Sequence, residues 1–126
     1  MSKSVNKIVQ AALVDAFSKN PEFEVFGEQG RMRYESLEYC YRKIENSAER
    51  AVAIWVCPDT TQKTYEIDVA VIVRIIPEER FHRYFSREEI GQRPGLNPID
   101  IPQAVKDLVA LAINQIDSVD LPERSL

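Results

Sequence analysis

Three carboxylates in the middle of the chain are the residues best suited to chemistry. Asp59 follows Pro58 in a polar stretch, and Glu66 and Asp68 lie two positions apart in the next apolar stretch. Side chains two residues apart on a strand point to the same face. Carboxylate oxygens of this kind are ligands for Mg²⁺, which can activate water for hydrolysis. The spacing is therefore compatible with a metal-dependent hydrolytic site.

These residues loosely resemble a restriction-nuclease pattern, in which a proline-aspartate is followed on the next strand by an acid, any residue and a lysine. The resemblance implies that the carboxylates hold magnesium and that the lysine positions water. It covers residues 58–68 only, and Asp68 stands where the pattern has lysine. We favour a structural interpretation, in which Asp59 stabilises a turn while Glu66 and Asp68 line a solvated strand face.

A single histidine, His82, restricts other kinds of catalysis. A serine or cysteine nucleophile needs a base, and zinc is held mainly by histidine and cysteine. No acid or nucleophile lies at a diagnostic spacing from His82, and Cys40 and Cys57 have no paired spacing. The chain has only four glycines, too few for the usual phosphate-binding loops. We therefore predict no catalytic triad, no metal site and no cofactor, and we lean against an enzyme.

A zone rich in arginine and aromatic residues extends from residue 74 to residue 93. These residue types bind phosphates and bases, and they are also common at the centres of protein interfaces. Glutamates in the same zone cancel most of its charge, which is typical of a solvated helix face. We rank a solvated face first, a protein contact second and nucleic-acid binding third. The candidate contact residues of this zone are Arg80, Arg83, Tyr84 and Arg87.

A tyrosine-rich stretch is the second candidate contact surface. It contains Tyr34, Tyr39 and Tyr41, of which we select the last two as candidate binding residues. Tyrosine is common at interfaces because it combines an apolar ring with a polar hydroxyl. Half-buried packing within a sheet explains these tyrosines equally well.

The composition is that of one globular domain. The chain has 126 residues, of which 44% are hydrophobic and 29% are charged. Its net charge of −4 disfavours nucleic-acid binding and is compatible with a basic protein partner. No stretch approaches the roughly 20 apolar residues that cross a bilayer. We expect two reduced cysteines and a cytoplasmic protein.

Amphipathic helices are predicted near both ends of the sequence. Near the N-terminus, Ser4 can cap a helix whose apolar stripe continues to Phe17. Near the C-terminus, Asp100 can cap a helix whose stripe ends at Ile116. Residues 118–126 are polar, and we expect a frayed tail there.

A β-hairpin is the clearest prediction between the helices. Residues 50–57 form a nearly continuous apolar run, residues 58–63 have loop composition, and residues 64–76 alternate. In this last segment the odd positions are apolar and the even positions are half polar. The half-polar face is either solvated or covered by something that supplies polar partners.

The segments on either side of the hairpin are less distinct. Residues 31–44 fit helical spacing, but their tyrosines favour a strand with one irregularity, which we prefer. Residues 78–85 are predicted to form a short helix, residues 86–89 a capped turn, and residues 91–98 a loop. A short strand is expected at residues 23–26.

These elements predict a single α+β domain over residues 1–126, with a short antiparallel sheet of about three strands packed against N- and C-terminal amphipathic helices. Exposed sheet edges would be covered in a homodimer. The function we predict is a non-enzymatic protein-binding module, such as an inhibitor, an immunity-like protein or an assembly adaptor. The alternative is an atypical metal-dependent nuclease-like enzyme that uses Asp59, Glu66 and Asp68.

Overall fold

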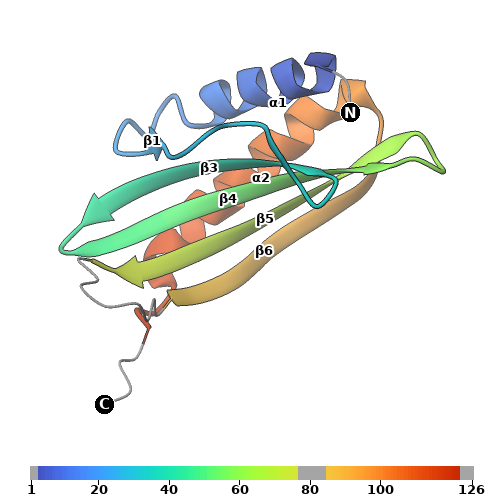
Figure 1. Ribbon diagram of the computed structural model, residues 1–126. Helices are drawn as coiled ribbons and strands as arrows, with labels where there is room; N and C mark the ends of the chain where they lie inside the picture. The colour runs from blue at the N-terminus through green and yellow to red at the C-terminus, as the bar shows by residue number, and fades with distance from the viewer. Residues whose placement is uncertain (1–2, 77–84, 123–126) are drawn as a thin grey trace.

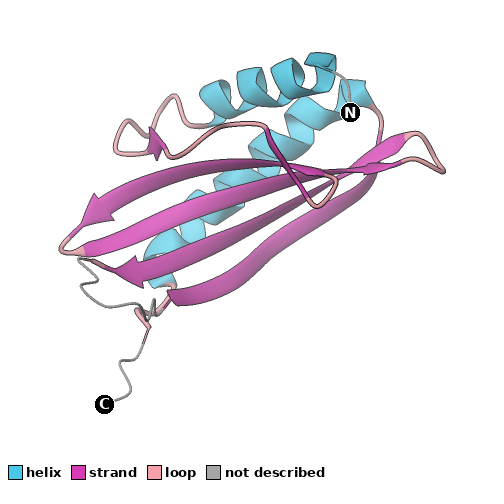
Figure 2. Cartoon of the chain, in the orientation of Figure 1, coloured by secondary structure: helices cyan, strands magenta, loops and turns pink. Residues whose placement is uncertain are grey.

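An antiparallel sheet forms one layer of the molecule and two helices form the other (Figures 1 and 2). The computed structural model describes residues 3–76 and 85–122. The elements are, in chain order, α1 (Lys3–Ala16), β1 (Glu24–Val25), β2 (Arg31–Arg33), β3 (Ser36–Glu45), β4 (Ala48–Asp59), β5 (Thr64–Ile75), β6 (Phe85–Leu96), the 3₁₀ helix η1 (Pro98–Asp100), α2 (Ile101–Gln115) and the 3₁₀ helix η2 (Ile116–Ser118).

The α+β class and the antiparallel sheet are confirmed, but the prediction of about three strands is wrong. The described part of the sheet has six strands in the order β1-β3-β4-β5-β6, with β2 also paired to β3. Much of the difference comes from β6, whose residues were predicted to form a turn and a loop. Its sequence is charged and contains glycine and proline, and most of its side chains are solvent-exposed. It therefore has the composition of a loop. The helix predicted at residues 78–85 lies almost entirely outside the described residues.

The segment at residues 31–44 is β-structure, as we favoured. The expected irregularity is a complete reversal of the chain, because Tyr34 and Glu35 both have positive φ angles, 51° and 65°. They form the turn between β2 and β3. Asn46 and Ser47, in the turn between β3 and β4, also have positive φ angles. Turns of this kind match the right-handed twist of the strands that they join.

One face of the sheet is covered by the helix layer. Alternate residues of β3, β4 and β5 point into this layer, and the central ones, such as Ile54 and Val69, are fully buried. The helix α2 packs against β4, β5 and β6, whereas α1 packs chiefly against α2. Only α2 therefore meets the expectation of a helix packed directly on the sheet. The apolar stripe of α1 nevertheless joins the same core through Val5, Val9, Ala12 and Leu13.

Gly91 on β6 allows α2 to lie close to the sheet. A Cβ atom at this position would be 2.7 Å from Cδ2 of Leu108. The pairing of β6 with β5 is also irregular next to Gly91, between the positions of Val69 and Ala70. A side chain at this position would therefore displace the buried Leu108 side chain of α2.

The end of α2 is tied to the central strand β4. The Arg50 guanidinium donates hydrogen bonds from Nη1 to the carbonyl oxygens of Ile116 and Val119, at 2.6 and 2.8 Å. Val119 is buried, although we predicted a frayed tail from residue 118. Residues 123–126 of that tail lie outside the described residues. At the start of α2, Asp100 belongs to η1 and makes no side-chain capping bond.

Candidate binding groove on the open face of the sheet

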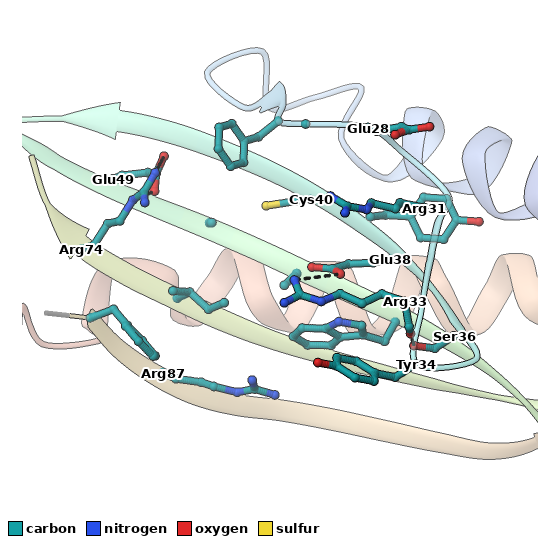
Figure 3. Close-up of a pocket in the computed structure, with 18 residues that line it drawn as sticks. Glu28, Arg31, Arg33, Tyr34, Ser36, Glu38, Cys40, Glu49, Arg74 and Arg87 are labelled. Atoms are coloured by element: carbon teal, nitrogen blue, oxygen red, sulfur yellow. Dashed lines mark hydrogen bonds and ion pairs between the residues drawn. The ribbon is translucent and has the colours of Figure 1, made fainter. Parts of the chain in front are cut away.

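A groove of about 750 Å³ lies on the sheet face opposite the helices (Figure 3). Its floor is formed by small side chains at the centre of the sheet. Ala53 on β4 is opposite Cys40 on β3 and Ala70 on β5. Ala51 and Ile72, another opposite pair, continue the floor. The small side chains of Ala51 and Ala53 leave a hollow that larger β-branched side chains would fill.

Trp55 and arginines form one end of the groove. The Arg87 guanidinium carbon is 4.8 Å from the centre of the Trp55 ring, which is a cation–π distance. Arg33 and Glu38 form an ion pair of 3.9 Å at the same end, and Tyr34 lies beside them (Figure 3). Tyr34 is 92% exposed although its ring is large and apolar. This end therefore presents aromatic surface and guanidinium groups to the solvent.

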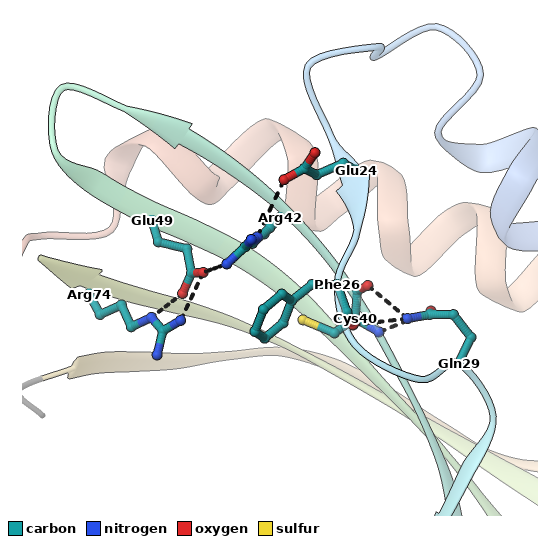
Figure 4. A network of polar contacts seen from close by, with 7 residues as sticks. All are labelled: Glu24, Phe26, Gln29, Cys40, Arg42, Glu49 and Arg74. Atoms are coloured by element: carbon teal, nitrogen blue, oxygen red, sulfur yellow. Dashed lines mark hydrogen bonds and ion pairs between the residues drawn. The ribbon is translucent and has the colours of Figure 1, made fainter. Parts of the chain in front are cut away.

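The opposite end is closed by a buried carboxylate between two arginines (Figure 4). Glu49 on β4 is only 4% exposed. Its Oε1 accepts hydrogen bonds from Arg42 Nη1 at 2.6 Å and from Arg74 Nη2 at 2.9 Å, and its Oε2 contacts Arg74 Nε. Burial by itself raises the pKa of Glu49, but hydrogen bonds and charges from the two arginines outweigh this effect and lower it. The three residues come from adjacent strands, so they connect β3, β4 and β5.

The segment at residues 24–35, here called the covering segment, runs along the β3 edge of the sheet. Its Phe26 ring lies 4.1 Å from the Arg42 guanidinium carbon. Gln29 replaces a strand partner for Cys40, because its side-chain amide donates to the Cys40 carbonyl at 3.2 Å and accepts from the Cys40 N–H at 3.3 Å (Figure 4). The covering segment thereby supplies one wall of the groove. Its polar contacts go to β3. The polar side chains of β5 find partners within the sheet instead, because Arg74 pairs with Glu49 of β4 and Glu66 accepts a hydrogen bond from Gln92 of β6.

Four arginines and three glutamates line the groove. Its lining therefore has a net charge of +1 in a chain whose net charge is −4. The arginines are Arg31, Arg33, Arg74 and Arg87, and the glutamates are Glu28, Glu38 and Glu49.

The three candidate carboxylates do not form one group. Glu66 and Asp68 meet Cys57, and the ligand atoms of these three residues lie within 4.8 Å of one another. Asp59 instead stabilises the turn after β4, because its Oδ1 accepts hydrogen bonds from the Thr61 and Gln62 N–H groups, both at 3.1 Å. This is the turn role that we favoured from the sequence.

Burial and nearby negative charges affect the pKa values in the group formed by Cys57, Glu66 and Asp68. Burial, followed by the charge of Asp68, raises the pKa of Glu66. Burial also raises the pKa of the Cys57 thiol. One oxygen of Asp68 is buried and has no hydrogen-bond partner among the described residues. The ligand atoms of these three residues are close enough together to approach one cation.

The predicted contact residues are divided between the two faces. Tyr39 is fully buried, and its hydroxyl donates a hydrogen bond to Asn6 Oδ1 at 2.8 Å. Tyr41 is also buried, and its ring stacks on Phe17 at 4.1 Å. Both tyrosines thus belong to the core, because odd positions of β3 point toward the helices. Arg87 lines the groove, whereas Arg80, Arg83 and Tyr84 lie outside the described residues.

The sequence interpretation missed the alanine floor and the buried Glu49. Alternate alanines in the run Arg50–Cys57 were a usable signal, because small residues at every second position of a strand hollow one face. The partners of Glu49 had no comparable signal. They depend on the register of three strands.

No family model, curated protein or solved structure matches the chain. Functional inference therefore depends on the chemistry of the groove itself. Neither α1 nor α2 is long and apolar enough to span a membrane. Both cysteines are free thiols.

Proposed function

We propose that the chain is a non-enzymatic protein-binding module that receives part of another protein in the open-face groove. The supporting observation is a hollow sheet face surrounded by exposed aromatic side chains. Tyr34 is 92% exposed, Phe85 is 58% exposed, and Trp55 and Phe26 also line the groove. Exposed apolar surface of this kind is typical of interaction sites, and tryptophan, tyrosine and arginine are the commonest residues at their energetic centres.

The described groove residues are better suited to recognition than to catalysis. None of them is a histidine, and most of the charged ones are already paired with an opposite charge. Burial raises the pKa of the Cys40 thiol to about 11. A cysteine with this pKa is almost entirely protonated at neutral pH and is a poor nucleophile. The lining therefore supplies shape, aromatic surface and hydrogen-bond donors.

The nuclease-like alternative has weaker support. Its three carboxylates would have to converge, but the Asp59 carboxylate is occupied by the turn. Asp68 stands where the nuclease pattern has its lysine, so the residue that would position water is missing from the pattern.

We expect the partner to be another protein in the cytoplasm, where free thiols persist. A second copy of this chain is the alternative occupant of the groove. Size-exclusion chromatography with light scattering distinguishes the two, because only self-association depends on the concentration of the pure protein.

Site-specific photo-crosslinking in cells that naturally express the protein tests the proposal. A benzophenone amino acid at Tyr34 should give a discrete crosslinked product with one partner. The same group at Ile99, which is 87% exposed but does not line the groove, is the control. Ala51→Leu, which fills the groove floor, should abolish the product from position 34. Identical products from both positions, or a product that persists in the filled variant, would contradict the proposal.

A further inference from the structure

We propose that the groove binds a peptide segment of its partner that carries a large apolar side chain next to a carboxylate. This inference rests on the proposed binding function and specifies the chemistry of the partner. Three observations support it. The floor of the groove is hollow and apolar, the arginines that line the groove include exposed ones, and the β6 edge of the sheet is poorly suited to pairing with a further strand.

The floor suits one inserted apolar side chain. The side chains of Ala51, Ala53 and Ile72 offer no hydrogen-bonding group, and the two small alanines leave the hollow open between Trp55 and the Glu49 ion pairs. A bulky aliphatic or aromatic side chain would bury apolar area there, and burial of apolar area favours binding. Anchors of this kind dominate the affinity of small interfaces.

Two exposed arginines remain available to bind an incoming carboxylate. Arg33 and its partner Glu38 are 3.9 Å apart, and the Arg33 side chain is 60% exposed. Arg87 pairs with Glu89, and these side chains are 45% and 65% exposed. Ion pairs between solvent-exposed side chains contribute little free energy, so they exchange partners at little cost. A planar guanidinium can bind a carboxylate through two parallel hydrogen bonds.

A third arginine, Arg31, also lines the groove, and it forms no ion pair with any described residue. The groove is thus locally positive in an acidic molecule. A partner carboxylate placed between Arg33 and Arg87 would lie beside the Trp55 ring, next to the hollow. This arrangement requires the acidic and the apolar residue to be neighbours in the peptide.

The free edge of the sheet is a less suitable place for the partner. The strand β6 forms that edge, and it carries Pro94, two irregularities of pairing with β5 and a series of charged side chains. These features protect edges against the addition of a further strand. They favour docking on the face of the sheet over extension of the sheet.

Selection from a phage-displayed library of random linear peptides tests the inference, with the full chain as the target and the Ala51→Leu variant for counter-selection. We expect enriched sequences to pair a bulky apolar residue with Asp or Glu. A synthetic peptide of the enriched sequence should change the fluorescence of Trp55, which is the only tryptophan of the chain. Replacement of its acidic residue by the corresponding amide should weaken binding about tenfold, equivalent to about 1.4 kcal/mol.

Surface variants separate this inference from the proposed function. Arg33→Gln and Arg87→Gln change exposed side chains, and together they should weaken peptide binding at least as much as loss of the peptide carboxylate. Val14→Leu, on the solvent-facing side of α1, should leave binding unchanged. Peptides that need the groove but lack acidic residues, and that bind the arginine variants as tightly as the original chain, would overturn this inference. The proposed protein-binding function would still stand. Peptides that bind Ala51→Leu normally, or no enrichment at all, would overturn both.

Discussion

The two faces of the sheet use the same strands for opposite purposes. Toward the helices, β4 and β5 present β-branched side chains such as Ile54, Val69 and Val71, all fully buried. Toward the covering segment they present alanine, tryptophan and charged residues that form the groove. Because neighbouring residues of a strand point in opposite directions, one sequence carries both patterns without conflict. The comparison indicates that stability is concentrated on the face that packs against the helices, and binding capacity on the open face.

Matched isoleucine truncations should reveal the largest difference between the faces. Ile54→Ala removes a fully buried side chain under the helices and should lower the free energy of unfolding by about 4 kcal/mol. Ile72→Ala acts on the open face, where the side chain is only partly buried, and should cost about 1 kcal/mol. Urea denaturation followed by circular dichroism measures both. Equal losses would show that the open face is part of the core.

The buried Glu49 is the exception on the open face, and its removal should have the second largest effect. Glu49→Gln leaves two arginines facing each other across the sheet and should cost about 3 kcal/mol. Glu38→Gln, which breaks only an exposed pair, should cost less than about 0.5 kcal/mol. If Glu49→Gln lowers the free energy of unfolding only slightly, the ion pairs of Glu49 do not hold the three strands together.

The same carboxylate predicts the direction of a pH effect. The folded state lowers the pKa of Glu49 below its ordinary value of 4.5. Glu49 therefore contributes stability above that value and loses it as the pH falls through its folded pKa. Denaturation curves from pH 7 to pH 3 should show an acid-induced loss that is smaller in the glutamine variant. An unchanged pH profile in that variant would contradict this assignment.

Gly91 tests how closely the helix layer approaches the sheet. Gly91→Val places atoms where Leu108 now lies, and we expect a loss of about 2 kcal/mol from overpacking. Gln92→Val, one residue further along β6 and exposed, is the matched control and should change stability by less than about 0.5 kcal/mol. Thermal melting of both variants makes the comparison. A tolerated valine at position 91 would indicate that α2 can move away from β6.

The smallest expected effect concerns Glu66 on the open face. Asp68→Asn removes a neighbouring negative charge, so the raised pKa of Glu66 should move back toward its ordinary value. Carboxyl-carbon NMR titration measures this directly. A Glu66 pKa that does not respond would show that burial alone is responsible.

The sequence predicted the parts of the fold that depend on local patterns. The hairpin of β4 and β5 followed from a nearly continuous apolar run and a strict alternation, and both are properties of short segments. The strand β6 was not predicted, since its exposed, charged residues resemble a loop until β5 supplies their hydrogen-bond partners. Ala51 and Ala53 were a usable signal for a hollow face, but the groove also requires Cys40 to lie beside Ala53 and Ile72 to lie beside Ala51. Only the register of three strands determines that.

The bond from Arg50 to the end of α2 has a consequence for how the chain tolerates change. The acceptors of this latch, the pair of hydrogen bonds from Arg50, are main-chain carbonyls. The two bonds therefore depend on the backbone conformation after the helix and not on the side chains there. Substitutions at Asp117 or Ser118 should therefore be neutral for this latch. Truncation before residue 116 would instead leave the guanidinium without its acceptors beside the central strand. This end of the protein should therefore tolerate substitution but not deletion.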